Sequence, residues 1–193
     1  MPLQTFDTGK LRLGTMTRGL KPLVPLTYQD GDLNFTQLTV LLPPLPVKSY
    51  DAATGRLVLS LSGSAMALAK LQALQDATLA AVRGGQRTWF AGAKARDAED
   101  LRQGFQPMVE HTSLHLYCSS SGGTEFTLWS KGEWLRGLAA TAALVPGAVV
   151  RFAVRLQGIS FHQHAVTGVW TGKCRLQHRV LGAFAAAAAG GST

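Results

Sequence analysis

The sequence predicts a mainly β domain that carries one long amphipathic helix. Apolar and polar residues alternate in several short segments, as in half-buried strands, and only one long stretch has helical spacing instead. The chain has 193 residues, of which 46% are hydrophobic, and this is enough to bury a core without disulfides or metal. We expect a single domain over residues 1–181 and a flexible tail rich in Ala and Gly over 182–193.

The N-terminal quarter is expected to form only short strands. Its prolines exclude long helices and confine strands to short or edge pieces. Residues 38–42 make the best early strand, and residues 1–34 are taken as an N-terminal extension of the domain. The segment 56–62, RLVLSLS, places three leucines on one face of a further strand. The prolines that limit this region are Pro22, Pro25, Pro43, Pro44 and Pro46.

The predicted helix spans about residues 64–83. Ser64 can cap its N-terminus, and apolar residues follow at the spacing of one helix face. Gly84 and Gly85 are expected to end it. The aromatic pair Trp89–Phe90 that follows is expected to anchor in the core.

The second half of the chain has the alternation of strands. A short helix is expected over 97–103 before them, and a short helical or irregular piece over 132–143 between them. The loop SSSGG at 119–123 separates the first two strands. The expected strands span 111–118, 124–130, 145–161 and 169–180.

The net charge points to a polyanionic partner. Lys and Arg number 19 against 11 Asp and Glu, which gives a formal charge of +8. Such an excess favours nucleic acid or an anionic surface, although composition by itself names neither. The placement of the cations along the chain carries more information.

Two C-terminal strands each carry a basic stripe opposite an apolar one. In both 149–156 and 169–180, alternate positions are cationic while the intervening ones are mostly apolar. If the two strands pair as a hairpin, like charges on one face would destabilise the sheet unless an anion binds there. A solvated strand face, with the charges separated by register, is the alternative interpretation. The cations concerned are Arg151, Arg155, Lys173, Arg175 and Arg179.

Aromatic residues interleave with further cations. Trp129 and Trp134 lie beside Lys131 and Arg136, and Trp170 precedes the last basic stripe. Single-stranded nucleic acid is held by a positive groove together with aromatic side chains on which bases stack. These five residues therefore join the predicted binding set, although each Trp alone is more often a core residue.

Catalytic and metal-binding motifs are missing from the sequence. The histidines and the two cysteines, Cys118 and Cys174, form no Cys-x-x-Cys or His-Glu-x-x-His pattern. Neither a phosphate-binding glycine loop nor a Gly-x-Ser-x-Gly elbow occurs. We therefore expect a non-enzymatic protein without a cofactor. Two cysteines are too few for a disulfide scaffold, which favours a reducing intracellular compartment.

The order of the segments resembles the phage-type single-stranded DNA-binding proteins of large DNA viruses. The matching motifs run through most of 35–181, and each is short. They are LLPPLPV (41–47), RLVLSLSG (56–63), KLQALQDATLAAV (70–82), RTWF (87–90), LHLYC (114–118), VPGAVV (145–150), RLQGISF (155–161) and GVWTGKCRLQHRV (168–180). The resemblance implies an OB-fold-like antiparallel barrel with the helix inserted, and non-specific binding of single-stranded DNA in viral replication or recombination.

The C-terminus departs from that family. Its members often end in an acidic tail that recruits replication enzymes, whereas this chain ends AAAAAGGST. The resemblance places the protein in an infected host cell or in the virion. The expected partners are single-stranded DNA, with replication proteins and further copies of the chain as additional candidates, and no membrane. A β-rich assembly subunit whose basic face binds an acidic partner is the alternative function.

Overall fold

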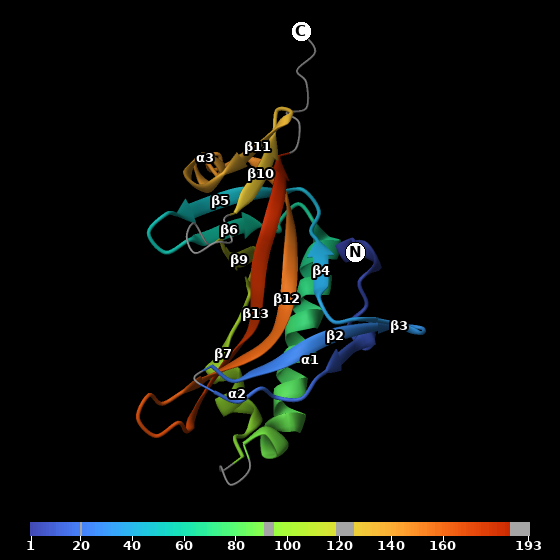
Figure 1. The fold of residues 1–193 in the computed structure, drawn as a ribbon, viewed down its shortest axis with the longest axis vertical. Coiled ribbons are helices and arrows are strands. Elements are labelled where there is room, and N and C mark those ends of the chain that lie inside the picture. The colour runs from blue at the N-terminus through green and yellow to red at the C-terminus, as the bar shows by residue number, and fades with distance from the viewer. Residues whose placement is uncertain (20, 91–94, 119–125, 186–193) are drawn as a thin grey trace.

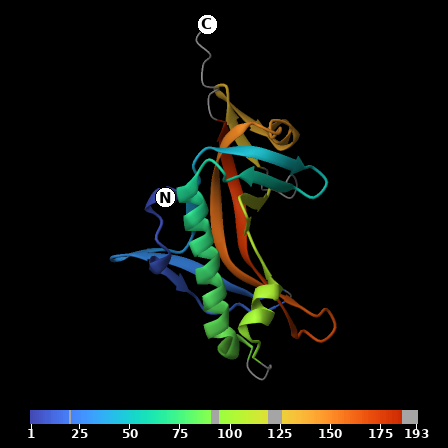
Figure 2. The same cartoon turned by 180° about the vertical axis from the view of Figure 1, so that it is seen from behind.

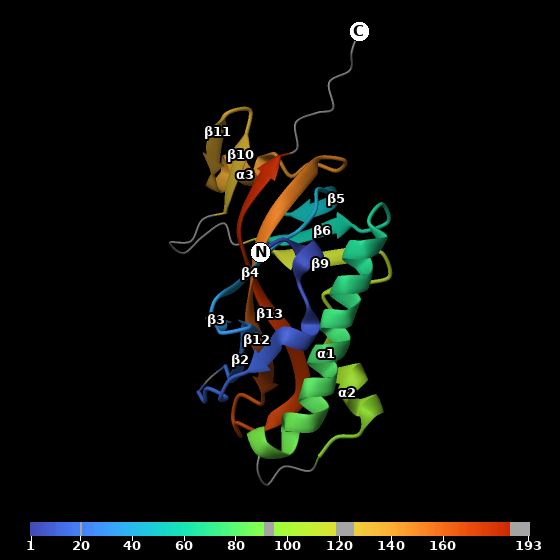
Figure 3. The same ribbon diagram turned by 90° about the vertical axis from the view of Figure 1, so that its right-hand side faces the viewer.

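A long β-hairpin forms the spine of the molecule. The computed structural model describes residues 1–19, 21–90, 95–118 and 126–185. The hairpin pairs β12 (Val149–Gln163) with β13 (Trp170–Ala185), and helix α1 (Ala65–Trp89) runs behind both strands (Figures 1 and 2). The side view shows that α1 covers only one face of the hairpin (Figure 3).

Shorter strands flank both edges of the hairpin. β12 pairs antiparallel with β2 (Leu23–Asp30), β4 (Leu38–Leu41) and β5 (Leu45–Asp51). β13 pairs parallel with β7 (Phe105–Gln106) and β10 (Thr127–Ser130). The sheet is therefore mixed, whereas the sequence predicted an antiparallel one.

The remaining elements complete two smaller groups. One group, at the N-terminus, pairs with β2; the other extends β5 and β10 at the opposite end of the hairpin (Figure 1). Helices α2 and α3 are short. The bounds are η1 Leu3–Thr5, η2 Thr8–Lys10, β1 Leu11–Leu13, β3 Leu33–Phe35, β6 Arg56–Ser60, α2 Ala98–Gly104, β8 Val109–Glu110, β9 Ser113–Tyr117, β11 Glu133–Arg136 and α3 Gly137–Ala142.

The strands do not close into a barrel. The main path of paired strands begins at β11 and ends at β8, and these two are not paired with each other in the part of the chain that the structure describes. β13 pairs with β7 near Cys174 and with β10 near Ala183, and no described strand joins the same edge between them. The mainly β fold with one long helix is confirmed, and the closed antiparallel barrel is not what the chain forms.

Local alternation predicts the core correctly along the hairpin. Val150, Phe152, Val154 and Leu156 are buried, as the apolar stripe requires. On the same side of the sheet, Leu71 and Leu74 of α1 belong to the same core cluster.

Helix α1 extends past its predicted end. It continues through Gly84 and Gly85 to Trp89. Gln86, in this extra segment, is buried, and its amide accepts from Arg96 N at 2.9 Å and donates to Arg96 O at 3.0 Å. These tertiary hydrogen bonds outweigh the weak helix propensity of two glycines.

The domain boundaries differ from the prediction at both ends. Leu3 and Phe6 are in the main core, so residues 1–34 are part of the domain rather than an extension of it. Residues 182–185 belong to β13 instead of the tail, and 186–193 lie outside the described residues, as does the predicted loop at 119–123. None of the described helices combines the length and apolar character needed to cross a membrane.

Candidate nucleic-acid interface

The predicted cations gather on the face of the hairpin that turns away from α1, here called the outer face. The register of β12 and β13 places Arg155 opposite Arg179 and Ser160 opposite Arg175. Arg151 and Lys173 are exposed on the same two strands. Residues opposite each other in register lie on one face of a sheet, so the two basic stripes share a face.

A bulge in β12 keeps this face continuous. Leu156 and Ile159 are both buried although they are three positions apart, because the register shifts between Leu156 and Gly158. Gly158 has φ +155°, and a Cβ there would meet Val24 O at 2.2 Å. Only glycine allows β2 to approach this closely. The bulge places Arg155 and Ser160 on the same face despite their odd spacing.

Three exposed aromatic rings form a row across the upper part of the outer face. Trp134 of β11 is opposite Trp129 of β10, Trp129 is opposite Phe184 of β13, and Phe184 is opposite Arg151 of β12. The three rings are 51%, 37% and 40% exposed. Ring centroids lie 5.3 Å apart for Trp129 and Trp134, and 5.7 Å apart for Trp134 and Phe184. We call Trp134, Trp129 and Phe184, together with Arg151 at the end of the row, the aromatic row.

Phe184 is the member that sequence reasoning missed. The predicted strand ended at residue 180, and the following AFA was assigned to the tail. The strand continues because Val180 and Ala183 are buried on its inner face. A register shift where Ala153 pairs with Gly182 and Val154 with Val180 leaves Leu181 as the extra residue. Alternation by itself could not reveal this shift.

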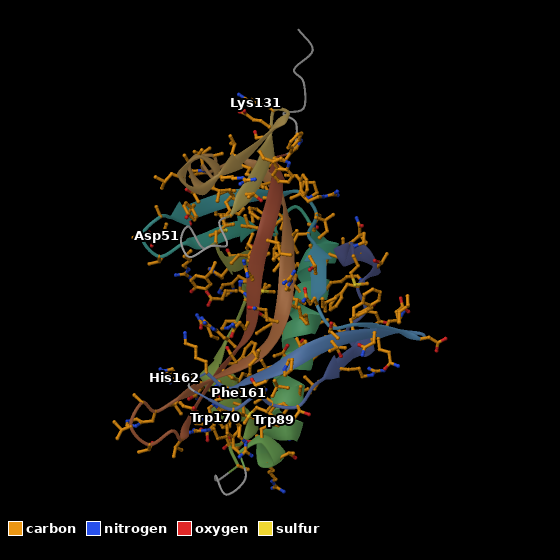
Figure 4. All side chains as sticks on the ribbon, viewed as in Figure 1. Asp51, Trp89, Lys131, Phe161, His162 and Trp170 are labelled. Carbon is orange, nitrogen blue, oxygen red and sulfur yellow. The ribbon has the colours of Figure 1, made fainter. Side chains whose placement is uncertain are left out.

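Lys131 and Arg136 border the aromatic row. Lys131 has φ +51° in the turn between β10 and β11, and Figure 4 places it at the far tip of the molecule. Arg136 ends β11 opposite Thr127 and is two positions from Trp134, so both side chains are on one face of the strand. Both cations are exposed. The structure therefore brings these two predicted residues beside the row.

Trp170 lies in the core rather than on the binding face. It is only 6% exposed, its ring stacks on Phe90 at 4.6 Å, and it meets Phe161 edge-on at 5.7 Å. Its Nε1 donates to Lys173 O at 2.9 Å. Figure 4 shows Trp170 beside Trp89 and Phe161, at the end of the molecule opposite Lys131. The prediction that Trp170 stacks on a base is wrong, whereas the core role predicted for the Trp89–Phe90 segment is confirmed.

The cations of the outer face form no ion pair with a carboxylate in the part of the chain that the structure describes. The ion pairs of the described chain are Lys10–Asp30, Arg102–Glu99 and His115–Glu110. None involves the five cations of the two stripes. Arg155 Nε is moreover buried and has no hydrogen-bond partner among the described residues. A face with this much unpaired positive charge is electrostatically suited to an anion.

A basic hollow extends the outer face toward the lower end of the hairpin. It has a volume of about 570 Å³, and its cationic side chains are Lys21, Lys173 and Arg175, with His162 beside them. Of the described side chains that line it, none is a carboxylate. We call it the lysine hollow. Lys21 comes from a segment that no pattern in the sequence placed near the stripes.

The described histidines, cysteines and carboxylates do not form a metal-binding group of three or more. Both cysteines are buried, and burial raises the pKa of each thiol to about 12. They are therefore inert core residues at neutral pH.

Comparison of the chain with protein-family models, curated proteins and solved structures gave no match.

Proposed function

We propose that the protein binds single-stranded DNA without sequence preference, through the outer face of β12 and β13. The observation that carries the proposal is the aromatic row, which ends at Arg151 and lies on the same face as Arg155 and Arg179. Exposed rings and unpaired cations on one surface are what a flexible polyanion with planar bases requires.

Stacking would take place on the three exposed rings of the aromatic row. Each ring keeps more than a third of its surface exposed, and stacking of one base is worth about 1–3 kcal/mol. Because every base has a π-face, this contribution favours single strands without selecting a sequence. A duplex would keep its bases stacked on each other and so could not use the row.

Phosphates would follow the arginines down the hairpin. Positions two apart on a strand are separated by about 6.6 Å, and Arg175 and Arg179 are four apart on β13. The strand could therefore run from the aromatic row over the Arg155–Arg179 pair to the lysine hollow. An OB-like interpretation of the sheet fits this path, since OB domains bind oligonucleotides on one sheet face and the adjoining loops.

The experiment is a titration with fluorescently labelled oligo-dT at several salt concentrations. The double variant Arg155→Gln, Arg179→Gln is compared with Arg83→Gln, Arg87→Gln, which removes the same charge from α1 on the other side of the sheet. We expect the outer-face variant to lose at least tenfold in affinity, and its log–log salt slope to fall by about 1.4. The α1 variant should change affinity by less than twofold. Equal losses in the two variants, or binding that ignores salt, would overturn the proposal.

An assembly subunit is the second candidate, and a specific observation favours it. Three further apolar residues are exposed, Leu138 (81%) of α3, Val149 (40%) of β12, and Val145 (54%) between these two elements, and α3 lies beside β11, which carries Trp134 (Figure 1). Contiguous exposed apolar residues are typical of protein interfaces. Sedimentation of the protein alone separates the two functions: a stable assembly with no affinity for oligo-dT supports the subunit, and a monomer that binds oligo-dT supports the first proposal.

A further inference from the structure

A second pocket adjoins the lysine hollow and differs from it in chemistry. It has a volume of about 300 Å³ and lies between the open edge of β13 and strands β6, β8 and β9. Arg175 lines both the pocket and the lysine hollow, as do Gln106 and Gln177. Because Glu110 of β8 also lines it, we call it the Glu110 pocket. Its size is at the lower end of the range for small-ligand sites, about 300–1,000 Å³.

The Glu110 pocket presents hydrogen-bond donors and an acceptor together. Arg56 donates through Nη2 to His115 Nδ1 at 3.1 Å, so His115 carries its proton on Nε2. That nitrogen lies 3.4 Å from Glu110 Oε2 and makes no hydrogen bond with a described residue. Arg175 has no ion-pair partner among the described residues, as reported above. The pocket thus combines two guanidinium groups with one carboxylate.

The remaining lining is suited to a flat ring. Tyr117 is 39% exposed and offers an aromatic face, and Met108 and Pro107 supply apolar surface. A carboxylate would repel a phosphate in this pocket, whereas the lysine hollow has cations and no described carboxylate. The two adjoining sites therefore suit the two halves of a nucleotide, with the base in one and the phosphate in the other.

We infer that one nucleotide of the bound strand inserts its base into the Glu110 pocket and leaves its phosphate on Lys173 and Arg175, and that guanine is the preferred base. The inference deepens the proposed function and rests on it. Guanine presents N1–H and N2–H side by side to a carboxylate, and O6 and N7 side by side to a guanidinium fork. Adenine, cytosine and thymine cannot satisfy both groups in this paired manner.

The test compares oligo-dT strands that carry a single central guanine, adenine or cytosine with plain oligo-dT. We expect the guanine strand to bind about tenfold more tightly than the others. Glu110→Gln should remove this preference, measured as the ratio of the affinities for the guanine strand and for plain oligo-dT. Asp76→Asn on α1 removes the same charge from an exposed position, and it should leave the preference intact.

The outcomes separate this inference from the proposed function. Tight binding of plain oligo-dT with no preference for guanine, or a preference that survives Glu110→Gln, overturns the inference and leaves the proposed function standing. If no strand binds, the proposed function fails. NMR titration with guanosine and thymidine monophosphates then tests whether the Glu110 pocket binds guanine. Changes in the chemical shifts of Tyr117 and His115 that occur only with the guanine nucleotide, and that are lost in Glu110→Gln, would support guanine binding in the Glu110 pocket. Equal changes with both nucleotides, or no changes, would overturn it.

Discussion

Arg155 of β12 lies directly opposite Arg179 of β13 on the outer face. Directly opposed residues have Cβ atoms about 4.5–5.5 Å apart, and like charges at that separation destabilise a sheet. No described carboxylate neutralises either guanidinium, and Arg155 Nε is buried without a partner. The folded protein therefore carries an electrostatic cost at the centre of the surface that we propose for binding.

Reversing one charge of this pair should stabilise the protein and weaken binding at the same time. Arg179→Glu converts the repulsive pair into an attractive one, and we expect it to raise the free energy of unfolding by about 1 kcal/mol at low salt. The gain should shrink at high salt because the charges are screened. Denaturant unfolding at two salt concentrations measures both effects, and oligo-dT titration measures the loss of affinity.

Arg151→Glu is the matched control for this substitution. Arg151 is opposite Phe184 rather than a cation, so the same charge reversal relieves no direct repulsion. We expect an unchanged free energy of unfolding together with a comparable loss of oligo-dT affinity. If both variants gained equal stability, the net charge of the protein rather than the Arg155–Arg179 pair would be the cause.

Two adjacent glycines of α1 should respond in opposite directions to alanine. A Cβ at Gly84 would meet nothing within 4 Å, whereas a Cβ at Gly85 would lie 2.4 Å from the Trp89 ring. Gly84→Ala should therefore raise the free energy of unfolding by about 1 kcal/mol through helix propensity. Gly85→Ala should lower it by about 1–3 kcal/mol, because Trp89 would have to leave its contact with Phe161. Thermal melts of the two single variants give the comparison.

The outcome at Gly85 depends on how firmly Trp89 is held. Its ring centroid is 5.6 Å from that of Phe161, inside the cluster that also contains Trp170 and Phe90. If Gly85→Ala were as stabilising as Gly84→Ala, this end of α1 would not be packed as described. The double variant Gly85→Ala, Trp89→Leu should recover part of the loss, because the clash is removed.

Periodicity in the sequence predicts the features that depend on neighbouring residues along the chain, such as the face of a strand on which a side chain lies. It does not predict features that depend on contacts between distant segments. The alternation around Arg155 and Arg179 is local, so the sequence predicted that each lies on the polar face of its own strand, whereas their common face depends on the register of the two strands. The burial of Trp170 depends on Phe90, which is 80 positions away in the chain. Likewise, α1 continues past Gly84 because Gln86 bonds to Arg96. The sequence around Trp170 does not indicate its contact with Phe90, and the sequence around Gly84 does not indicate the hydrogen bonds between Gln86 and Arg96.

The position of the aromatic row required the register of three strand pairs. Trp129 and Trp134 were predicted as stacking residues from their polar surroundings, and the structure places both on an exposed face. Phe184 joins them only because β13 runs in parallel beside β10, with Trp129 opposite Phe184. Parallel pairing between segments more than 50 residues apart leaves no signal in local alternation.

The two cysteines should be unreactive in the folded protein. Burial raises the pKa of Cys118 and Cys174 to about 12, so almost no thiolate is present at pH 8, and both side chains are shielded from solvent. We expect an aromatic disulfide reagent to label neither thiol in native buffer and both in denaturant. Labelling measured across a urea series should follow the unfolding transition, and fast labelling at zero urea would contradict the packing around β9 and β13.

His178, at the open edge of β13, is half-buried, and its Nε2 is shielded from solvent. Its Nδ1 lies 3.3 Å from Leu176 O, and since a carbonyl only accepts, Nδ1 carries the proton. Nε2 is then an acceptor, and it has no partner among the described residues. Burial and, to a smaller extent, the nearby Arg175 lower the pKa of His178 to about 4, and the hydrogen bond to Leu176 O opposes them in part. Tyr117 packs against its ring.

This histidine should make the fold sensitive to acid between its unfolded and folded pKa values. In the unfolded chain His178 takes up a proton near pH 6.5, whereas the folded pKa is about 4. The unfolded state therefore binds more protons in this interval, and stability falls as pH drops from about 6.5 to about 4. The other ionisable groups that line the same pocket are Arg56, Glu110, His115, Tyr117 and Arg175, and they remain in every variant compared.

His178→Phe isolates this contribution. The substitution removes a buried acceptor that has no described partner, so we expect equal or greater stability than the natural protein at pH 7. The advantage should grow by roughly 3 kcal/mol by pH 4, since the natural protein loses stability through His178 and the variant does not. Denaturant unfolding at pH 7, 5.5 and 4 gives the difference directly. A constant difference across these values would mean that His178 titrates normally in the folded protein and that its Nε2 is therefore not shielded as described.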